Sequence, residues 1–225
     1  MQHKQVMDGR GGQGATRVLE TLERDDADEA AVILARCPAV DVSAGEPHFR
    51  SSLPPAALLL VDEGFCVLRI PRPDAARSII TCEAGPGSVL LPPGDAEVLF
   101  GLTDARLIAI PQAEVDRLLR IPSVARMLLD QLATTLGHKQ EAIGTFAVTR
   151  HVERVRRKLL QLARSYGRVG RDGIRIDFPL SHTLLAEMIG SSRETVTRAL
   201  DELQRRGFVA RRGHKYRLLI SPREV

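Results

Sequence analysis

The sequence contains no tryptophan, and all aromatic residues together make up only 4% of its 225 residues. Proteins that bind single-stranded nucleic acid stack bases on aromatic side chains, so this class is disfavoured. No apolar run approaches the roughly 18 residues of a membrane-spanning helix. The first 16 residues are polar and glycine-rich and lack the apolar core of a signal peptide. We therefore expect a cytoplasmic protein with no membrane partner.

Cysteine is scarce, and the motifs of common enzymes are missing. Cys37, Cys66 and Cys82 show no CxxC or metal-ligand spacing, which argues against a disulfide scaffold and for a reducing compartment. We interpret each cysteine as a small buried apolar residue. There is no GxSxG or P-loop, and the GRGGQG segment at residues 9–14 follows no strand. We expect no enzymatic activity.

Charge is distributed very unequally along the chain. Residues 149–225 carry 18 Lys and Arg against 8 Asp and Glu, a net charge of +10. Residues 1–148 carry 14 against 20, a net charge of −6. The C-terminal third is therefore suited to a polyanionic partner.

Proline divides the chain at a similar place. Nine of the thirteen prolines lie between Pro38 and Pro93, a density that excludes long helices and suits short strands joined by turns. We expect an antiparallel β sandwich or roll, preceded by a helix over residues 18–36, with residues 1–16 disordered. The expected strands cover residues 57–61, 65–70, 77–82, 88–91 and 106–110.

A helical pattern replaces the strand pattern after Pro122. Apolar residues recur at alternating spacings of 3 and 4, as in a heptad seam, with one lysine among them. The pattern fits either a dimerisation helix or an ordinary amphipathic helix packed on its own domain. The seam consists of Leu129, Leu132, Leu136, Lys139, Ile143 and Phe146.

Residues 180–206, LSHTLLAEMIGSSRETVTRALDELQRR, predict a helix-turn-helix. Ser181 can cap a first helix, whose inner face would hold Leu184, Leu185 and Met188. Gly190 permits the tight turn because it reaches left-handed φ without a Cβ clash. Ser191 or Ser192 can then cap the second helix.

The second helix carries the chemistry of base recognition. Arg193, Glu194 and Arg198 are spaced by one and four residues and project together, away from an inner face of Val196, Leu200 and Leu203. Arginine matches the O6 and N7 acceptors of guanine, and glutamate accepts from cytosine N4. Residues 207–220 then predict a basic hairpin wing with Gly213 at its tip, where phosphates would lie.

These motifs resemble the Crp/Fnr family of transcription regulators. The likeness is most specific over residues 190–209, GSSRETVTRALDELQRRGFV, and continues upstream over residues 143–163, IGTFAVTRHVERVRRKLLQLA. It implies an α+β protein with a β-roll (cupin-like jelly roll) sensor domain, a long central dimerisation helix and a C-terminal winged helix-turn-helix. It also implies a homodimer that binds a palindrome in double-stranded DNA.

The resemblance assigns roles to particular residues. Arg193, Glu194 and Arg198 occupy the positions that read TGTGA-like half-sites in the family. His182 stands where a permanent cation is common. With the wing and the start of the second helix, the phosphate-contacting set becomes Ser181, His182, Thr183, Ser192, Thr195, Arg212, His214 and Lys215.

The sensor region departs from the family's cyclic-nucleotide pattern. Residues 85–102 lack the Gly-Glu pair and the following arginine that hold the phosphate, so cyclic AMP is not expected in the familiar mode. Residues 1–35 contain no cysteine for an iron-sulfur cluster. His48, His138 and Cys82 are available to a haem, but no spacing singles them out. An unidentified effector contacting Lys139 and Gln140, or no effector at all, is left open.

The expected organisation is a tail over residues 1–16, a β-roll over 17–120, a dimerisation helix over 121–148 and the DNA-binding domain over 149–225. A basic, glycine-rich loop over residues 166–173 could touch RNA polymerase or be a mere linker. A non-specific architectural DNA-binding protein is the alternative function.

Overall fold

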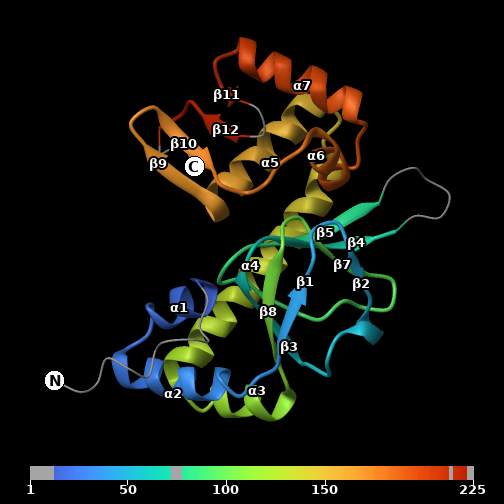
Figure 1. Ribbon diagram of the computed structural model, residues 1–225. Helices are drawn as coiled ribbons and strands as arrows, with labels where there is room; N and C mark the ends of the chain where they lie inside the picture. Colours follow the sequence, from blue (N-terminus) through green and yellow to red (C-terminus); the bar gives the residue numbers. More distant parts are fainter. Residues whose placement is uncertain (1–12, 72–77, 213–214, 222–225) are drawn as a thin grey trace. The chain divides into compact units, whose positions relative to one another are not determined.

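The computed structural model describes residues 13–71, 78–212 and 215–221, which form two compact units (Figure 1). The first unit comprises Met1–Arg69 and Cys82–Leu136, and the second comprises Ile70–Thr81 and Gly137–Val225. The first is built on β-sheet and the second combines helices with a small sheet. This confirms the α+β class.

Two four-stranded sheets occupy residues 39–110, with strand orders β1-β8-β3-β6 and β2-β7-β4-β5. The first sheet contains β1 (Ala39–Val42), β8 (Ala105–Ile110), β3 (Leu58–Glu63) and β6 (Val89–Leu90). The second contains β2 (Pro47–His48), β7 (Val98–Gly101), β4 (Cys66–Ile70) and β5 (Ile79–Ala84). A short 3₁₀ helix, η1 (Arg50–Ser52), follows β2.

All five expected strand runs contain a strand, whereas β1, β2 and β7 were not expected from the sequence. These three strands have two to four residues each, too few to show a period. Their partners define them: β1 pairs with β8 over four residues, and β7 lies between β2 and β4.

Strand β3 separates the two halves of the first unit's core. Leu58 and Leu60 face a cluster that includes residues of the helices, while Leu59 and Val61 face the second sheet's residues. Side chains alternate between the faces of a strand, so a continuous apolar run is buried on both sides. This explains why β3 shows no polar alternation.

The expectation that residues 1–16 are disordered is wrong for residues 13–16, which the structure describes as helix. Helix α1 (Gln13–Leu19) includes part of the expected tail over residues 1–16, of which residues 1–12 lie outside the described chain. The Ala15 amide donates to the buried Asp62 carboxylate at 2.9 Å. A Cβ on Gly14 would lie 2.1 Å from the Val61 carbonyl oxygen, so glycine is needed for α1 to reach β3.

The single helix expected over residues 18–36 is also interrupted. Helix α1 ends at Leu19, and α2 (Arg24–Leu34) starts after a turn. The Thr21 hydroxyl donates to the Val18 carbonyl at 2.7 Å, a local bond that competes with helix continuation.

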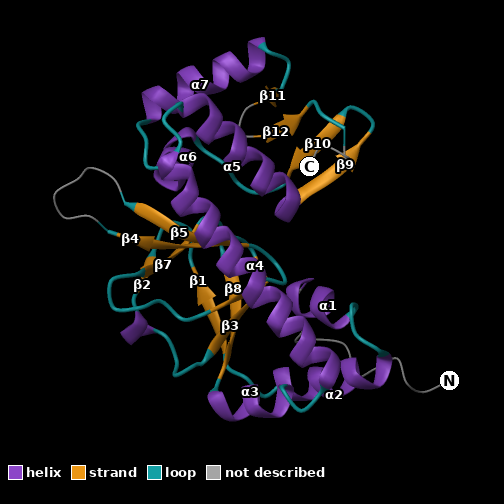
Figure 2. Cartoon of the chain, turned by 180° about the vertical axis from the view of Figure 1, so that it is seen from behind, coloured by secondary structure: helices purple, strands orange, loops and turns teal. Residues whose placement is uncertain are grey.

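Helix α3 (Gln112–Leu118) leads into the long helix α4 (Pro122–Ala147), and the first turns of α4 pack against α2 and α3 (Figure 2). The boundary between the units falls within α4, after Leu136. No helix among the described residues is both long and apolar enough to cross a membrane.

The second unit is a winged helix-turn-helix in order and topology. Its helices are α5 (His151–Tyr166), α6 (His182–Ile189) and α7 (Arg193–Arg205). Its sheet, ordered β11-β12-β10-β9, contains β9 (Gly167–Gly170), β10 (Gly173–Ile176), β11 (Val209–Arg212) and β12 (Lys215–Leu218). Most of the loop expected over residues 166–173 is therefore strand β9 and its turn into β10.

Candidate nucleic-acid interface

Helix α6 begins and ends as the sequence predicts. The Ser181 hydroxyl accepts a hydrogen bond from the Leu184 amide at 3.0 Å, which satisfies one of the orphan donors of the first turn. Gly190 ends the helix at φ 60° and ψ 46°, the left-handed region that glycine enters without strain. The inner residues Leu184, Leu185 and Met188 are buried.

The structure decides between the two candidate caps of α7. The Ser192 hydroxyl accepts from the Thr195 amide at 3.0 Å and donates to the Thr195 hydroxyl at 2.8 Å. Ser191 is buried instead, with its hydroxyl 3.1 Å from Nδ1 of His151 at the start of α5. Ser192 therefore positions the N-terminus of α7, and Ser191 ties the turn to α5.

Helix α7 presents two distinct faces. Val196, Leu200 and Leu203 are buried, as expected, in contact with the rest of the second unit. Arg193, Glu194 and Arg198 are exposed. The structure thus brings the three expected base-reading residues onto one solvent-facing surface at the N-terminal half of the helix.

His182 joins the two helices and the wing. Its Nδ1 lies 2.8 Å from the Thr197 hydroxyl, which itself donates to the Arg193 carbonyl at 2.9 Å. Its Nε2 contacts the Arg211 guanidinium on β11. Both ring nitrogens therefore have partners within the protein, and sequence reasoning missed this link because residues 182, 197 and 211 are far apart in the chain.

The wing is the expected hairpin, formed by β11 and β12. Arg212 and Lys215 are exposed opposite each other at its end, and His214 lies outside the described residues. Burial raises the pKa of the Tyr216 phenol, and the hydrogen bond and positive charge of Arg211 partly oppose that shift. Arg211 thus connects the wing's buried tyrosine with His182.

The expected seam on α4 is exposed where its side chains are described. The exposed fractions are 65% for Leu129, 59% for Leu136 and 70% for Ile143, and Leu132 is also exposed. Lys139 is partly exposed, Gln140 is exposed, and the Phe146 side chain lies outside the described part of the chain. A row of this kind cannot be the buried face of an amphipathic helix packed on its own unit.

The cysteines occupy an apolar environment in the first unit. Cys66 and Cys82 are buried in one core cluster, as the sequence predicted, and Cys37 is half-buried. Burial, with a smaller contribution from neighbouring Cys82, raises the pKa of the Cys66 thiol to about 12. Within the described residues, no group of three or more His, Cys, Asp or Glu is arranged to hold a metal ion.

Comparison with known proteins gives matches over both units. Residues 153–223 match the family model of the Crp-like helix-turn-helix domain. The chain is 35% identical over 109 residues to the global nitrogen regulator of Synechocystis, covering 48% of each protein. It is 26% identical over 196 residues to the CRP-like cAMP-activated global transcriptional regulator of Mycobacterium tuberculosis, covering 82% of this chain and 84% of that one. The chain spans about half the length of the cyanobacterial relatives it matches.

Solved structures share the fold. A cyclic nucleotide-binding domain containing protein from Listeria monocytogenes superposes with a TM-score of 0.72 at 17% identity, covering 85% of this chain and 97% of that one. A CooA mutant from Carboxydothermus hydrogenoformans gives a TM-score of 0.69 at 17% identity, covering 86% and 88%. At these identities the likeness concerns the fold alone.

Proposed function

Because the chain belongs to the Crp/Fnr family of transcription regulators, we propose that it regulates transcription by binding a palindromic DNA site as a homodimer. The observation that carries the proposal is the exposed surface of Arg193, Glu194 and Arg198 on a capped helix beside a basic wing.

Helix α7 reads base edges in the major groove. Arg193 and Arg198 donate two hydrogen bonds each to guanine O6 and N7, and Glu194 accepts from cytosine N4. Each such contact discriminates against the wrong base by about 1–3 kcal/mol. The family resemblance gives TGTGA as the type of half-site.

Phosphate contacts come from the ends of the helices and from the wing. Thr183 is exposed, and the Thr195 hydroxyl, which accepts from Ser192, retains its own hydrogen for a phosphate oxygen. Arg212 and Lys215 on the wing supply charge, and His214, which lies outside the described residues, is a further proposed phosphate contact. Ser181 and Ser192 contribute chiefly as helix caps. His182 can bind a phosphate through Nε2 only if its contact with the Arg211 guanidinium is broken.

Helix α4 forms the dimer interface. Two copies of the exposed seam of Leu129, Leu132, Leu136 and Ile143 cover each other and exclude water. The resulting two-fold axis sets the recognition helices about 34 Å apart, one turn of DNA. The same symmetry explains why the site is a palindrome.

The effector is not cyclic AMP bound in the familiar mode, because residues 85–102 lack the charged groups that mode needs. An anionic small molecule that contacts Lys139 and Gln140 is one option, and regulation without an effector is the other. If Lys139→Ala changes neither DNA affinity nor any ligand response, the ligand option is refuted.

Fluorescence anisotropy on a TGTGA-N6-TCACA duplex and a scrambled duplex, over a salt series, tests the DNA-reading function. We expect ligand-free protein to favour the first duplex if no effector is needed. Equal and steeply salt-dependent affinities would require selection of sites from random duplexes, with and without cell extract. Failure to select any sequence in either condition would refute the proposal.

Glu194→Ala separates this function from the alternative, a non-specific architectural DNA-binding protein. In a sequence-specific reader the substitution relaxes the preference at one base pair of each half-site. In an architectural protein it only removes a negative charge, so affinity for all sequences rises together. Asp201→Ala, further along α7, removes the same charge from an exposed position and is the matched control.

A further inference from the structure

The two contacts of the His182 ring define its protonation state. The Thr197 hydroxyl donates its single hydrogen to the Arg193 carbonyl at 2.9 Å, so toward the ring this oxygen can only accept. Nδ1, which lies 2.8 Å from the same oxygen, therefore carries a hydrogen. The Arg211 guanidinium has donors and no acceptor, so Nε2 accepts from it. The ring is thus the neutral tautomer with its hydrogen on Nδ1.

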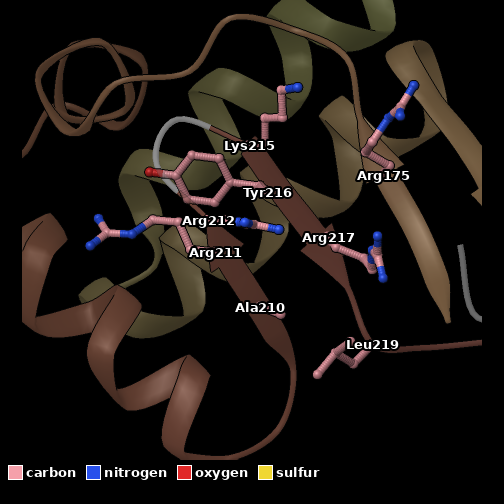
Figure 3. A pocket seen from close by; sticks show the side chains of 8 residues that line it. All are labelled: Arg175, Ala210, Arg211, Arg212, Lys215, Tyr216, Arg217 and Leu219. Carbon is pink, nitrogen blue, oxygen red and sulfur yellow. The ribbon is translucent and has the colours of Figure 1, made fainter.

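The His182 ring lies between α7 and the wing. Thr197, which contacts Nδ1, directly precedes Arg198 on α7. Arg211, which contacts Nε2, lies on β11 opposite the buried Tyr216. Residues directly opposite each other project from the same face of a sheet, so Arg211 points toward the helices. Figure 3 shows it extending away from the arginines of β10 and β12.

His182 lies on the surface that the proposed function assigns to DNA. It is the first residue of α6, and the N-terminus of a helix attracts anions. The neighbouring Thr183 and the contacting Arg211 are exposed, and His182 itself is partly exposed. The Crp/Fnr resemblance makes a permanent cation common at this position, whereas this chain has a histidine there. The charge that position 182 offers to a phosphate therefore depends on protonation.

The neutral ring is poorly suited to a phosphate. Thr197 engages the Nδ1 hydrogen, and Nε2 presents a lone pair, which a phosphate oxygen repels. A proton on Nε2 turns this atom into a donor and adds a positive charge. The new hydrogen would point at Arg211, which has no acceptor, so the contact between the two side chains breaks. Both cations are then available to phosphate oxygens.

The elements packed around α6 carry further charged and titratable groups. Cations outnumber carboxylates among them, so an additional positive charge on the ring becomes favourable only when an anion binds beside it. The groups are Glu187 on α6, Glu194, Arg198 and Asp201 on α7, His151 and Lys158 on α5, and Arg211, Arg212 and Lys215 on the wing.

We propose that DNA binding by this protein takes up a proton from solvent at His182, which then binds a phosphate oxygen through Nε2 while Arg211 turns to the DNA backbone. The inference rests on the proposed function and adds a dependence on pH to it. The histidine side chain exchanges its proton between about pH 5 and 8. Because the DNA-bound state holds the additional proton, affinity for DNA rises as pH falls through this range.

The test compares the unsubstituted protein with His182→Gln and His182→Arg by fluorescence anisotropy on the operator and its scrambled duplex. Affinity is measured over a salt series at about pH 6 and at about pH 8. Glutamine cannot take up the proton, and arginine is charged at both pH values. Circular dichroism at both pH values verifies that each variant is folded.

Two control variants each remove another titratable ring of the second unit. His151→Gln removes the ring that contacts Ser191. His214→Gln removes the histidine between β11 and β12, which lies outside the described residues. We expect both variants to keep the pH dependence of the unsubstituted protein.

We expect the unsubstituted protein to bind the operator about tenfold more tightly at pH 6 than at pH 8. Its salt slope is steeper at pH 6 by about two, one for each protomer, because each imidazolium neutralises one more phosphate. His182→Gln loses both effects and keeps the weaker affinity and the shallower slope. His182→Arg shows the tighter affinity and the steeper slope at both pH values.

Three results would overturn the inference alone. The first is an affinity of the unsubstituted protein that does not change with pH, for an operator that it prefers. The second is a pH dependence that persists in His182→Gln or disappears in His214→Gln, which would assign the proton to another group. The third is an equal weakening by His182→Gln and His182→Arg, which would show that His182 only braces the wing. If the unsubstituted protein prefers the operator to the scrambled duplex at neither pH, the proposed function fails first, and this inference fails with it.

Discussion

Ile143→Asp on helix α4 is the substitution that most directly tests the proposed dimer interface. Complete burial of a leucine or isoleucine side chain stabilises by about 1.5–3 kcal/mol. The exposed fractions of Leu129, Leu136 and Ile143 amount to about two whole side chains per protomer. Covering them on both protomers therefore contributes about 6–12 kcal/mol.

Association itself costs about 4–15 kcal/mol in lost translational and rotational freedom. The net free energy of dimerisation from this seam is therefore small. Ile143 is 70% exposed and accounts for about 1–2 kcal/mol in each protomer. Losing it from both copies costs about 2–4 kcal/mol, which raises the dimer dissociation constant by about 30-fold to 1000-fold. The two carboxylates placed in the seam add to this loss.

Sedimentation velocity over a series of protein concentrations measures the constant. Val32→Asp is the matched control, because Val32 is 56% exposed on α2, outside the seam, and its substitution leaves the dimer unchanged. The reasoning is refuted if Ile143→Asp and Val32→Asp give the same dissociation constant, or if the unsubstituted protein stays monomeric at concentrations where it binds DNA.

Four further predictions concern stability and reactivity. His182→Ala removes the hydrogen bonds to Thr197 and Arg211 and lowers the free energy of unfolding in urea by about 1–2 kcal/mol. Gly190→Ala forces a Cβ into the left-handed region and costs about 1–2 kcal/mol in the same assay. A thiol reagent modifies Cys37 in the native protein, whereas buried Cys66 and Cys82 react only on unfolding. Because burial raises the pKa of Cys66 from 9.0 to about 12, the unfolded thiol ionises first, and the free energy of unfolding falls as pH rises between these values.

The two substitutions have matched controls. Thr183→Ala, at the exposed neighbour of His182, changes stability by less than about 0.5 kcal/mol. Gly137→Ala lies in α4 with open space at its Cβ and stabilises the helix by about 0.5–1 kcal/mol. An equal effect of the two substitutions in either pair would contradict the local geometry, as would rapid modification of Cys66 in folded protein.

Local signals in the sequence were sufficient for the helix-turn-helix. Ser181 caps α6, Gly190 turns the chain and the apolar period places Val196 and Leu200 inside, because each of these features acts within a few residues along the chain. The exposure of Arg193, Glu194 and Arg198 follows from the same period. The five expected strand runs and the α4 helix were predictable for this reason too.

Only the tertiary structure shows the features that depend on contacts between residues far apart in the chain. Ser192 rather than Ser191 caps α7, because the Ser191 hydroxyl contacts His151 instead. Helix α1 is held against β3 because the buried Asp62 carboxylate accepts a hydrogen bond from the Ala15 amide. Short strands such as β1 and β7 exist only through their partners.

The arginines on the sheet of the second unit show the same division most clearly. The sequence by itself determined that residues 149–225 are strongly basic, but it predicted a loop where the structure has strand β9. Only the pairing of β9, β10 and β12 set Arg168, Arg175 and Arg217 in one row. Register between strands depends on contacts made by the whole sheet, and a shift of one residue would turn these side chains to the opposite face.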